Sequence, residues 1–287
     1  MRCLRSSIDR RATMIALASL IVATACRAPA KDRQAGVTTR ATDATLSEEA
    51  RAADSILRRS RIAAHGASPS PVRTRVMEGT YEYSGANGQH AVAPLEAHWR
   101  APGILYQEMR APFGLMRRWS DGTRGWASRP EFPNRPLPNA EIAEVRREVV
   151  FFQPADLAGE YTAYRFEGRR DLGGRTFDVV AATSRIGRTE RFYFDPATGL
   201  PAHLDVWEEG PEGLRSVGGG EYYQTRYTLS DYRTVDGTRL PFDILRKRPN
   251  SSARYRFERI RQNVPVDTTR EAPPREASGT VVPRPPG

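Results

Sequence analysis

Histidine and cysteine most readily bind metals or act in catalysis, and their spacing here fits neither role. The four histidines lie far apart with no H-E-x-x-H spacing, and the two cysteines form no C-x-x-C pair. A histidine on a strand is more often a surface group or a satisfied core group than a ligand. We therefore expect no metal or redox site. The residues concerned are His65, His90, His98, His203, Cys3 and Cys26.

Motifs for nucleophilic or phosphate chemistry are also missing. The sequence has no G-x-S-x-G elbow and no S-x-x-K, and Gly218–Gly220 lack the lysine and helix of a phosphate-binding loop. Carboxylates such as Asp231, Asp236 and Asp243 stand at turns or alternate outward, where turn formation and solvation explain them. The sequence thus favours a binding protein without a cofactor, and an enzyme such as a lipid hydrolase is the less favoured alternative.

Cys26 is the cysteine to which the N-terminal pattern assigns a chemical role. A positively charged start, the apolar run Met14–Val22 and three small residues precede it. This order resembles a bacterial lipoprotein signal, whose cysteine is acylated and becomes the new N-terminus after cleavage. We therefore expect residues 1–25 to be removed and Cys26 to carry the lipid. An ordinary signal peptide cut after Ala25 and a short transmembrane anchor are the alternatives.

Lipidation would place the protein in the bacterial cell envelope. Arg27 follows the cysteine, and by resemblance to the better-known sorting rule the absence of aspartate there indicates the outer membrane, facing the periplasm. Residues 26–44 are rich in Ala, Thr, Arg and Asp without an apolar period, as expected of a flexible tether. The expected partners are the membrane, through the N-terminal anchor, and another envelope protein.

The net charge of +10 does not indicate nucleic acid binding. Arginine provides nearly all the positive charge, since lysine occurs only at Lys31 and Lys247, and no basic stretch is interleaved with base-stacking aromatic residues. A length of 287 residues allows one compact domain of roughly 200 residues with tails. We place this domain at residues 45–266 and expect a disordered, Pro-rich tail at 267–287.

Two hairpins organise the predicted fold. In one, the alternating segment 191–194 runs into a turn at 195–199 that contains proline and glycine, and in the other Asp236-Gly237 joins two alternating segments. Capping residues and apolar stripes predict helices over 46–64 and 140–152.

Further strand-like segments complete the fold, and a Pro- and Asn-rich irregular link is expected at 129–139. The fold class is therefore α+β, mainly β, with a curved antiparallel sheet covered by helices. Strands are expected at 72–84, 91–100, 103–110, 164–169, 175–183, 189–195, 200–207, 221–232, 240–246 and 253–260.

Large apolar side chains on these strands are expected to line a cavity between the sheet and its helices. The segment from Phe113 to Met116 is predicted as a loop at the cavity rim, and the alternative is that Leu115 and Trp119 begin another strand and pack in the core. A second alternative is that the helices fill the space completely. The candidate lining residues are Trp99, Phe113, Leu115, Trp119, Phe192, Phe194, Phe242, Ile244 and Phe257.

Several segments together also carry a family resemblance. They are the N-terminal helix leading to Val76–Gly79, the stretch from Ala111–Gly114 to Ser120–Gly122, and the two hairpin segments Phe192–Leu200 and Ser230–Phe242. With them, the region from Thr45 to Val266 resembles the LolA/LolB-like lipoprotein carrier superfamily, which includes outer-membrane lipoprotein-sorting proteins and RseB-type regulators. The resemblance implies an unclosed β-barrel with helices as a lid over a hydrophobic cavity.

The resemblance implies two functions. The first is a membrane-anchored, non-enzymatic carrier that binds lipid or lipoprotein acyl chains. The second is an envelope-stress sensing or assembly module that acts through a protein partner. A cavity lined by apolar groups with few polar ones favours the first, because such a surface suits an acyl chain.

Overall fold

A computed structural model describes residues 35–67, 71–86, 88–112, 114–130, 132–152, 161–185, 187–209 and 222–272 of the chain. The chain divides into two units, Met1–Thr42 and Asp43–Gly287. Helix α1 (Ala35–His65) begins in the first unit and ends in the second. No helix within the described ranges combines the length and apolar character needed to cross a membrane. The expected signal peptide and Cys26 lie outside the described residues.

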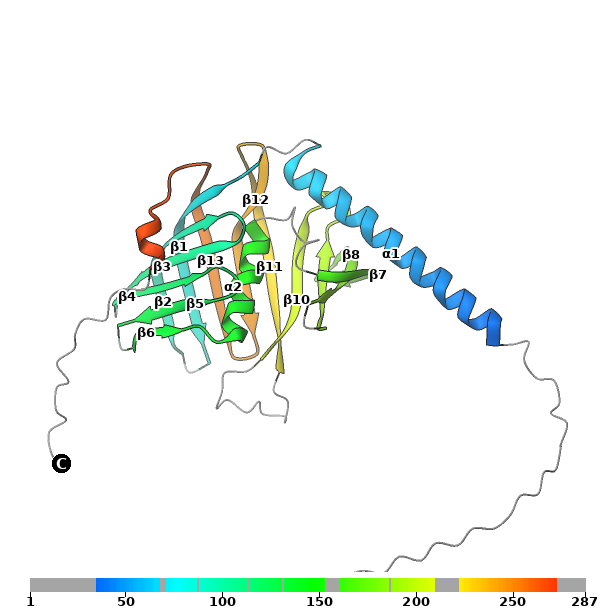
Figure 1. Cartoon of the computed structure of the whole chain (residues 1–287), viewed down its shortest axis with the longest axis horizontal. Coiled ribbons are helices and arrows are strands. Elements are labelled where there is room, and N and C mark those ends of the chain that lie inside the picture. The colour runs from blue at the N-terminus through cyan, green and yellow to red at the C-terminus, as the bar shows by residue number, and fades with distance from the viewer. Residues whose placement is uncertain are drawn as a thin grey trace, which may run out of the picture. The chain divides into compact units, whose positions relative to one another are not determined.

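The second unit is built on one antiparallel sheet of 13 strands (Figure 1). Its order is β6-β5-β4-β3-β2-β1-β13-β12-β11-β10-β9-β8-β7, which confirms the predicted mainly β fold. The strands are β1 (Thr74–Gly85), β2 (His90–Arg100), β3 (Ile104–Ala111), β4 (Gly114–Ser120), β5 (Gly125–Arg129), β6 (Phe132–Pro136), β7 (Tyr161–Leu172), β8 (Arg175–Ser184), β9 (Thr189–Phe194), β10 (Pro201–Glu209), β11 (Tyr222–Val235), β12 (Thr238–Arg248) and β13 (Ser251–Gln262).

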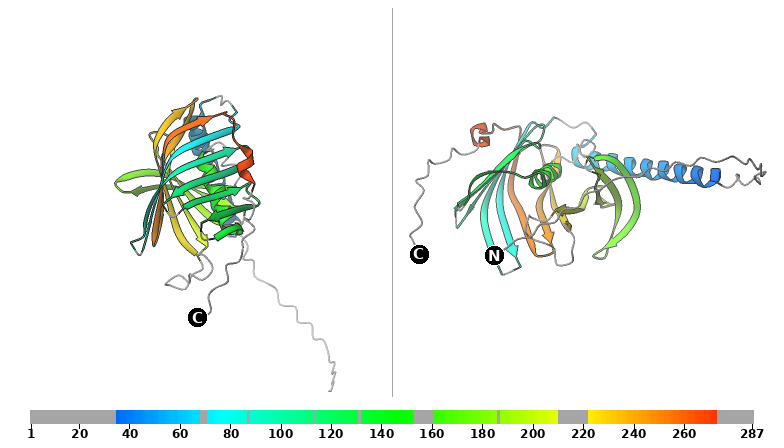
Figure 2. Two further views of the ribbon diagram at one scale, coloured as in Figure 1. Left: turned by 90° about the vertical axis from the view of Figure 1, so that its left-hand side faces the viewer. Right: turned by 60° about the horizontal axis from the view of Figure 1, so that its bottom comes forward.

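The sheet is curved and does not close into a barrel. Two meanders, β1 to β6 and β7 to β13, are joined where β1 pairs with β13. This leaves β6 and β7 as the two edges, and helix α2 (Asn139–Phe152) connects them in the sequence. Figure 2 shows α2 inside the curve of the sheet. The connection between the two edges therefore passes over one face.

Both predicted hairpin turns are present. Asp236 and Gly237 join β11 to β12 with φ values of 46° and 79°, the left-handed conformations that a tight two-residue hairpin requires. Between β9 and β10, the amide of Gly199 donates to the carbonyl of Asp195 at 2.7 Å, and Gly199 has φ 73°. Local turn chemistry therefore sets the register of these strands.

Three regions differ from the sequence prediction. Helix α1 begins at Ala35, so the segment expected as a tether is helical from that residue; a run free of proline can extend a helix past an internal capping box. Strands β4, β5 and β6 occupy residues 114–136, where a loop and an irregular link were expected. Residues 267–272, expected as part of a disordered tail, are ordered on the sheet.

The helices cover one face of the sheet, which we call the helix-covered face; the opposite one is the outer face. From α1, Ala53 and Ile56 join the main apolar core, and from α2, Ile142, Val145 and Phe151 do so. The α2 positions follow the helical 3-4 spacing, which brings one stripe of the helix onto the sheet. The core is thus a layer between the two helices and a single sheet face.

The C-terminal segment packs on the outer face through the short helix η2 (Thr268–Glu271). Arg270 donates to Glu96 at 2.8 Å and to Glu108 at 2.9 Å, with its guanidinium 4.8 Å from the centre of the Tyr106 ring. Glu271 accepts from Arg100 at 2.6 Å through its carboxylate. These ion pairs explain why the ordered domain extends beyond residue 266.

Replacing Arg270 with glutamine is expected to lower the free energy of unfolding at neutral pH by about 2 kcal/mol, because charged hydrogen bonds to Glu108 are lost. Burial alone would raise the pKa of Glu108, but hydrogen bonds from Arg270, Tyr106 and Arg117 lower it to about 2 from 4.5. A depressed carboxyl pKa stabilises the fold above pH 4.5, and this contribution disappears as the pH falls through about 2.

Urea unfolding of both proteins between pH 7 and pH 2 measures this difference. The gap between wild type and Arg270→Gln should narrow as the pH falls below 4.5. The exposed Arg256 supplies the matched control, since Arg256→Gln removes the same charge from the outer strand surface. A gap that is independent of pH would show that Arg270 acts through packing rather than through the carboxylate.

Candidate functional site

The helix-covered face gathers six of the nine predicted lining residues. All six are at most 5% exposed and belong to one apolar cluster that also contains residues of α1 and α2. Alternation along each strand directs them to this face, since side chains two positions apart share a side of a sheet. The six are Trp99 on β2, Phe192 and Phe194 on β9, Phe242 and Ile244 on β12, and Phe257 on β13.

Two predicted lining residues lie on the other face. Arg118 of β4 bonds to α2 on the helix-covered face, so its sequence neighbour Trp119 and the residue Leu115 point to the outer face. Trp119 stands opposite Tyr106 of β3, which carries the C-terminal segment. The prediction that Leu115 and Trp119 line the interior is therefore wrong. The alternative is confirmed in part: both residues belong to a strand, but they are half-buried on the outer face and do not pack in the core. Phe113 lies outside the described residues.

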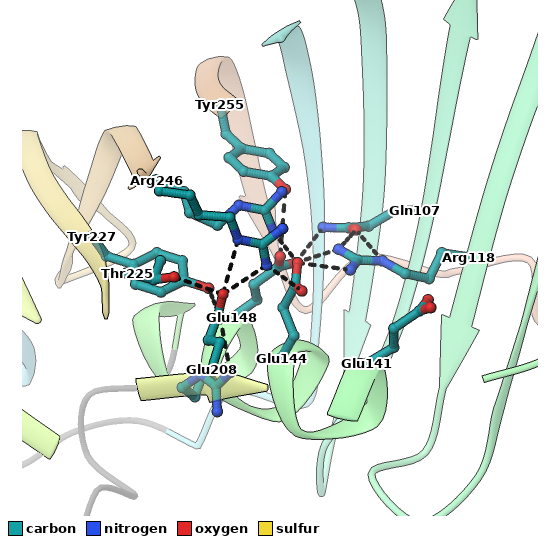
Figure 3. A network of polar contacts seen from close by, with 12 residues as sticks. Gln107, Arg118, Glu141, Glu144, Glu148, Glu208, Thr225, Tyr227, Arg246 and Tyr255 are labelled. Atoms are coloured by element: carbon teal, nitrogen blue, oxygen red, sulfur yellow. Dashed lines mark hydrogen bonds and ion pairs between the residues drawn. The ribbon is translucent and has the colours of Figure 1, made fainter. Parts of the chain in front are cut away.

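Beneath α2 the helix-covered face is strongly polar (Figure 3). Glu148 of α2 accepts from Arg118 at 2.6 Å and from Gln107 at 3.0 Å. It also accepts from the hydroxyl of Tyr255 at 3.4 Å. Burial lowers the pKa of Arg118, but the charge of Glu148 outweighs burial and raises that pKa above its ordinary value. Strands β3, β4 and β13 therefore meet at one carboxylate of the helix.

Glu144, one turn earlier on α2, binds two arginines of β12. Its carboxylate forms an ion pair with Arg246 and accepts from Arg248 at 2.9 Å. It also lies 3.6 Å from Arg118. Burial lowers the pKa of Arg246. Because all three cations surround one carboxylate, Glu144 links strands from both meanders to the helix.

Arg147 forms the third attachment of α2. Its guanidinium lies 3.0 Å from Glu208 and 3.6 Å from Glu190. Glu208 also accepts from Thr225 at 2.7 Å and from Arg248. Burial raises the pKa of Glu190, whereas the charges of Arg147 and Arg248 overcome burial and lower the pKa of Glu208. This side of the helix is thus fixed to β9, β10 and β11.

The charges of this network balance. It contains four arginines and four glutamates, and every one has a partner of opposite sign. The network, which we call the α2 network, consists of Arg118, Glu144, Arg147, Glu148, Glu190, Glu208, Arg246 and Arg248. Buried ion pairs gain little net stability, because the cost of desolvation offsets the attraction, but they fix geometry. The α2 network therefore positions the helix more than it stabilises the fold.

The sequence analysis missed the α2 network and expected a face with few polar groups. One signal was available: Arg246 and Arg248 continue the two-residue alternation that places Phe242 and Ile244 on the helix-covered face. An arginine in phase with buried residues indicates a buried partner.

None of the described residues forms a group of three or more His, Cys, Asp or Glu able to hold a metal. His98 contacts Glu96 at 2.7 Å, His203 contacts Thr228 at 3.1 Å, and His90 contacts Ser84 at 3.3 Å. The helix-covered face thus combines an apolar cluster with the paired charges of the α2 network.

No family model matches the sequence, and no curated protein matches it significantly. Solved structures do match. A DUF1329 family protein from Desulfovibrio piger is 14% identical with a TM-score of 0.54, covering 77% of this chain and 96% of its own. A LolA superfamily protein from Nitrosomonas europaea is 11% identical with a TM-score of 0.52, covering 77% and 97%.

A domain described as an outer membrane lipoprotein-sorting protein domain, from Vibrio parahaemolyticus, is 9% identical with a TM-score of 0.51. The match covers 77% of this chain and 96% of that domain. At these identities the comparison concerns the fold. The chain thus has a LolA-like fold, as the resemblance of its sequence segments implied.

Proposed function

We propose that this protein binds the acyl chains of lipids or lipoproteins on its helix-covered face and transfers them within the bacterial cell envelope, without catalysis. One observation carries the proposal: an unclosed sheet presents a continuous apolar cluster on the face that two helices cover. The fold shared with a lipoprotein-sorting domain supports it. Lipidation of Cys26 would hold the protein at the outer membrane, and this too is a proposal.

Binding in this proposal requires α2 to leave the face. Its apolar residues Ile142, Val145 and Phe151 pack in the cluster, and an acyl chain would replace these contacts with others of the same kind. Breaking the ion pairs of the α2 network costs little free energy, because the charged residues regain hydration when they separate. The acyl chain would therefore replace the apolar contacts of α2, and water would replace its ion pairs.

Native mass spectrometry of the protein purified from its own membrane is the direct test. We expect co-purified lipid, and the protein cleared of it should bind a fluorescent acyl probe. Protein that carries no lipid and binds no probe would contradict the proposal. Retention of one specific membrane protein regardless of lipid would then support the sensing or assembly alternative.

Fixing α2 to the sheet should block binding. In Glu144→Cys with Arg248→Cys, a short bismaleimide would join α2 to β12 where an ion pair of 2.9 Å now links them. We expect the cross-linked protein to bind the acyl probe at least about tenfold more weakly than the same variant without cross-linker. The matched control joins Glu78→Cys and Arg259→Cys, an exposed pair on the outer face. Unchanged binding after cross-linking of α2 would show that the helix does not move.

A further inference from the structure

A buried arginine on the helix-covered face has no counter-ion among the residues that the structure describes. Arg75, the second residue of β1, is 0% exposed, and its guanidinium donates from Nη2 to the amide oxygen of Gln262 at 3.4 Å. Its Nε and Nη1 groups have no acceptor among the described residues. Because ionised groups are buried at high cost unless they are paired, an unpaired guanidinium requires an explanation.

Two further polar groups beside Arg75 also lack partners. Trp99 pairs directly with Arg75 across β1 and β2, and its ring centre lies 5.3 Å from the Arg75 guanidinium carbon. Its indole N–H is buried, and no described residue accepts from it. His65, the last residue of α1, is 8% exposed and its Nε2 has no partner within the described chain. Three side chains thus present unsatisfied polar atoms in one place.

The protonation states favour an anion at this position. Burial lowers the pKa of Arg75 to about 10, so the guanidinium stays charged at neutral pH. Burial and, after it, the charge of Arg75 lower the pKa of His65, so the imidazole is neutral and can donate one hydrogen bond. The local charge is therefore positive and uncompensated.

These groups stand at one end of the apolar face. Arg75, Trp99 and Gln262 form a row across β2, β1 and β13, and each lies within one residue of the end of its strand. The next positions on the same face are occupied by Met77 and Ile260, which are buried and apolar. A molecule with its polar group at the row would lay an attached hydrocarbon chain against the apolar cluster.

Resting on the function proposed above, we propose that Arg75, with Trp99 and His65, binds the anionic head of an amphiphile whose hydrocarbon chain lies on the helix-covered face. A carboxylate or phosphate could accept from the Nε and Nη1 groups of Arg75 together, which is the geometry in which arginine recognises such anions. The indole N–H of Trp99 and the ring N–H of His65 would supply further donors.

Paired ligands test this assignment. Oleate and oleyl alcohol share a hydrocarbon chain and differ in the charge of the head, and each can be titrated against the bound acyl probe. The full protein should bind oleate at least about tenfold more tightly than oleyl alcohol, as expected for a charged hydrogen-bonded pair. Inorganic phosphate forms a third arm that detects an anion without a chain.

Arg75→Gln removes the charge and should reduce the preference for oleate to less than about threefold, because oleate loses more affinity than oleyl alcohol does. Its thermal stability without ligand should equal or exceed that of wild type, because an unpaired buried charge is gone. Arg73→Gln is the matched control: it removes the same charge from an exposed residue two positions earlier. Arg75→Lys, which keeps the charge without the planar fork, should be intermediate.

The outcomes separate the two proposals. Equal binding of oleate and oleyl alcohol by wild type would overturn the anionic head and leave acyl binding intact. Failure of wild type to bind either ligand would overturn both. Stabilisation by inorganic phosphate that depends on Arg75, without any effect of the oleyl chain, would assign the site to a free anion and overturn the amphiphile. Loss of folding in Arg75→Gln together with unchanged preference in Arg75→Lys would assign Arg75 a structural role.

Discussion

Gly79→Ala is expected to destabilise the domain by about 3 kcal/mol, at the upper end of the range for overpacking. A Cβ atom at Gly79 would overlap with the carbonyl oxygen of Arg256 and lie 2.8 Å from the Cα of Phe257. Both neighbours are backbone atoms at the β-bulge between β1 and β13, where the register shifts after Glu78. The bulge cannot give way without disturbing the seam that joins the two meanders.

Thermal and urea unfolding of Gly79→Ala measure the effect. Gly103→Ala is the matched control, because a Cβ at Gly103 meets no atom within 4 Å. We expect that control to change stability by less than about 0.5 kcal/mol. Similar stabilities for the two variants would contradict the assignment of Gly79 to a close backbone approach, and would mean that the bulge relaxes freely.

Glu148→Leu is expected to lower the free energy of unfolding by about 3 kcal/mol, which is the lower end of the range for breaking a buried ion pair. The substitution leaves Arg118 and Gln107 buried without the carboxylate that both now contact. The loss should stay near the lower end because Glu144 lies 3.6 Å from Arg118 and retains part of the attraction. Urea unfolding monitored by circular dichroism measures it.

Two further variants identify the cause. Glu141→Leu changes the same residue type on the same helix, but its pair with Arg135 is exposed and should contribute less than about 1 kcal/mol. The double variant Glu148→Leu with Arg118→Met should recover most of the lost stability, because both charges are then gone. If the double variant is less stable than Glu148→Leu alone, the α2 network stabilises the fold and does not only position the helix.

Local signals predicted helix α2, the C-terminal part of α1 and ten of the 13 strands found in the described residues. The turns at Asp236-Gly237 and Asp195–Gly199 depend on backbone conformations that those residues favour by themselves, so the hairpins were readable from the sequence. Strand β6 was missed because it contains proline, which normally argues against a strand. It forms an edge of the sheet, where the missing amide is tolerated.

Sequence alone could not assign Leu115 and Trp119 to a face. A shift of one residue in the pairing of β4 with β3 would reverse every side chain of β4, and the segment from Phe113 to Met116 was predicted as a loop rather than as the start of a paired strand. Trp119 lies on the outer face beside Tyr106. A segment about 150 residues later in the chain, which includes Arg270, covers Tyr106. Contacts of such separation leave no periodic trace in the sequence.

The pairings within the α2 network could not be predicted for the same reason. Arg246 and Glu144 are 102 positions apart, and only the path of α2 across the sheet brings them together. What the sequence does contain is the composition: arginines and glutamates in phase with apolar residues. Charged residues that share the two-residue alternation of buried apolar residues predict an interior that contains both polar and apolar groups.

The two connections of α2 differ in length. Two residues separate the end of β6 from the start of α2, whereas eight separate the end of α2 from the start of β7. Two residues span at most about 7 Å even when fully extended. A helix leaving the sheet would therefore rotate about its N-terminal end, with Leu137 and Pro138 as the pivot.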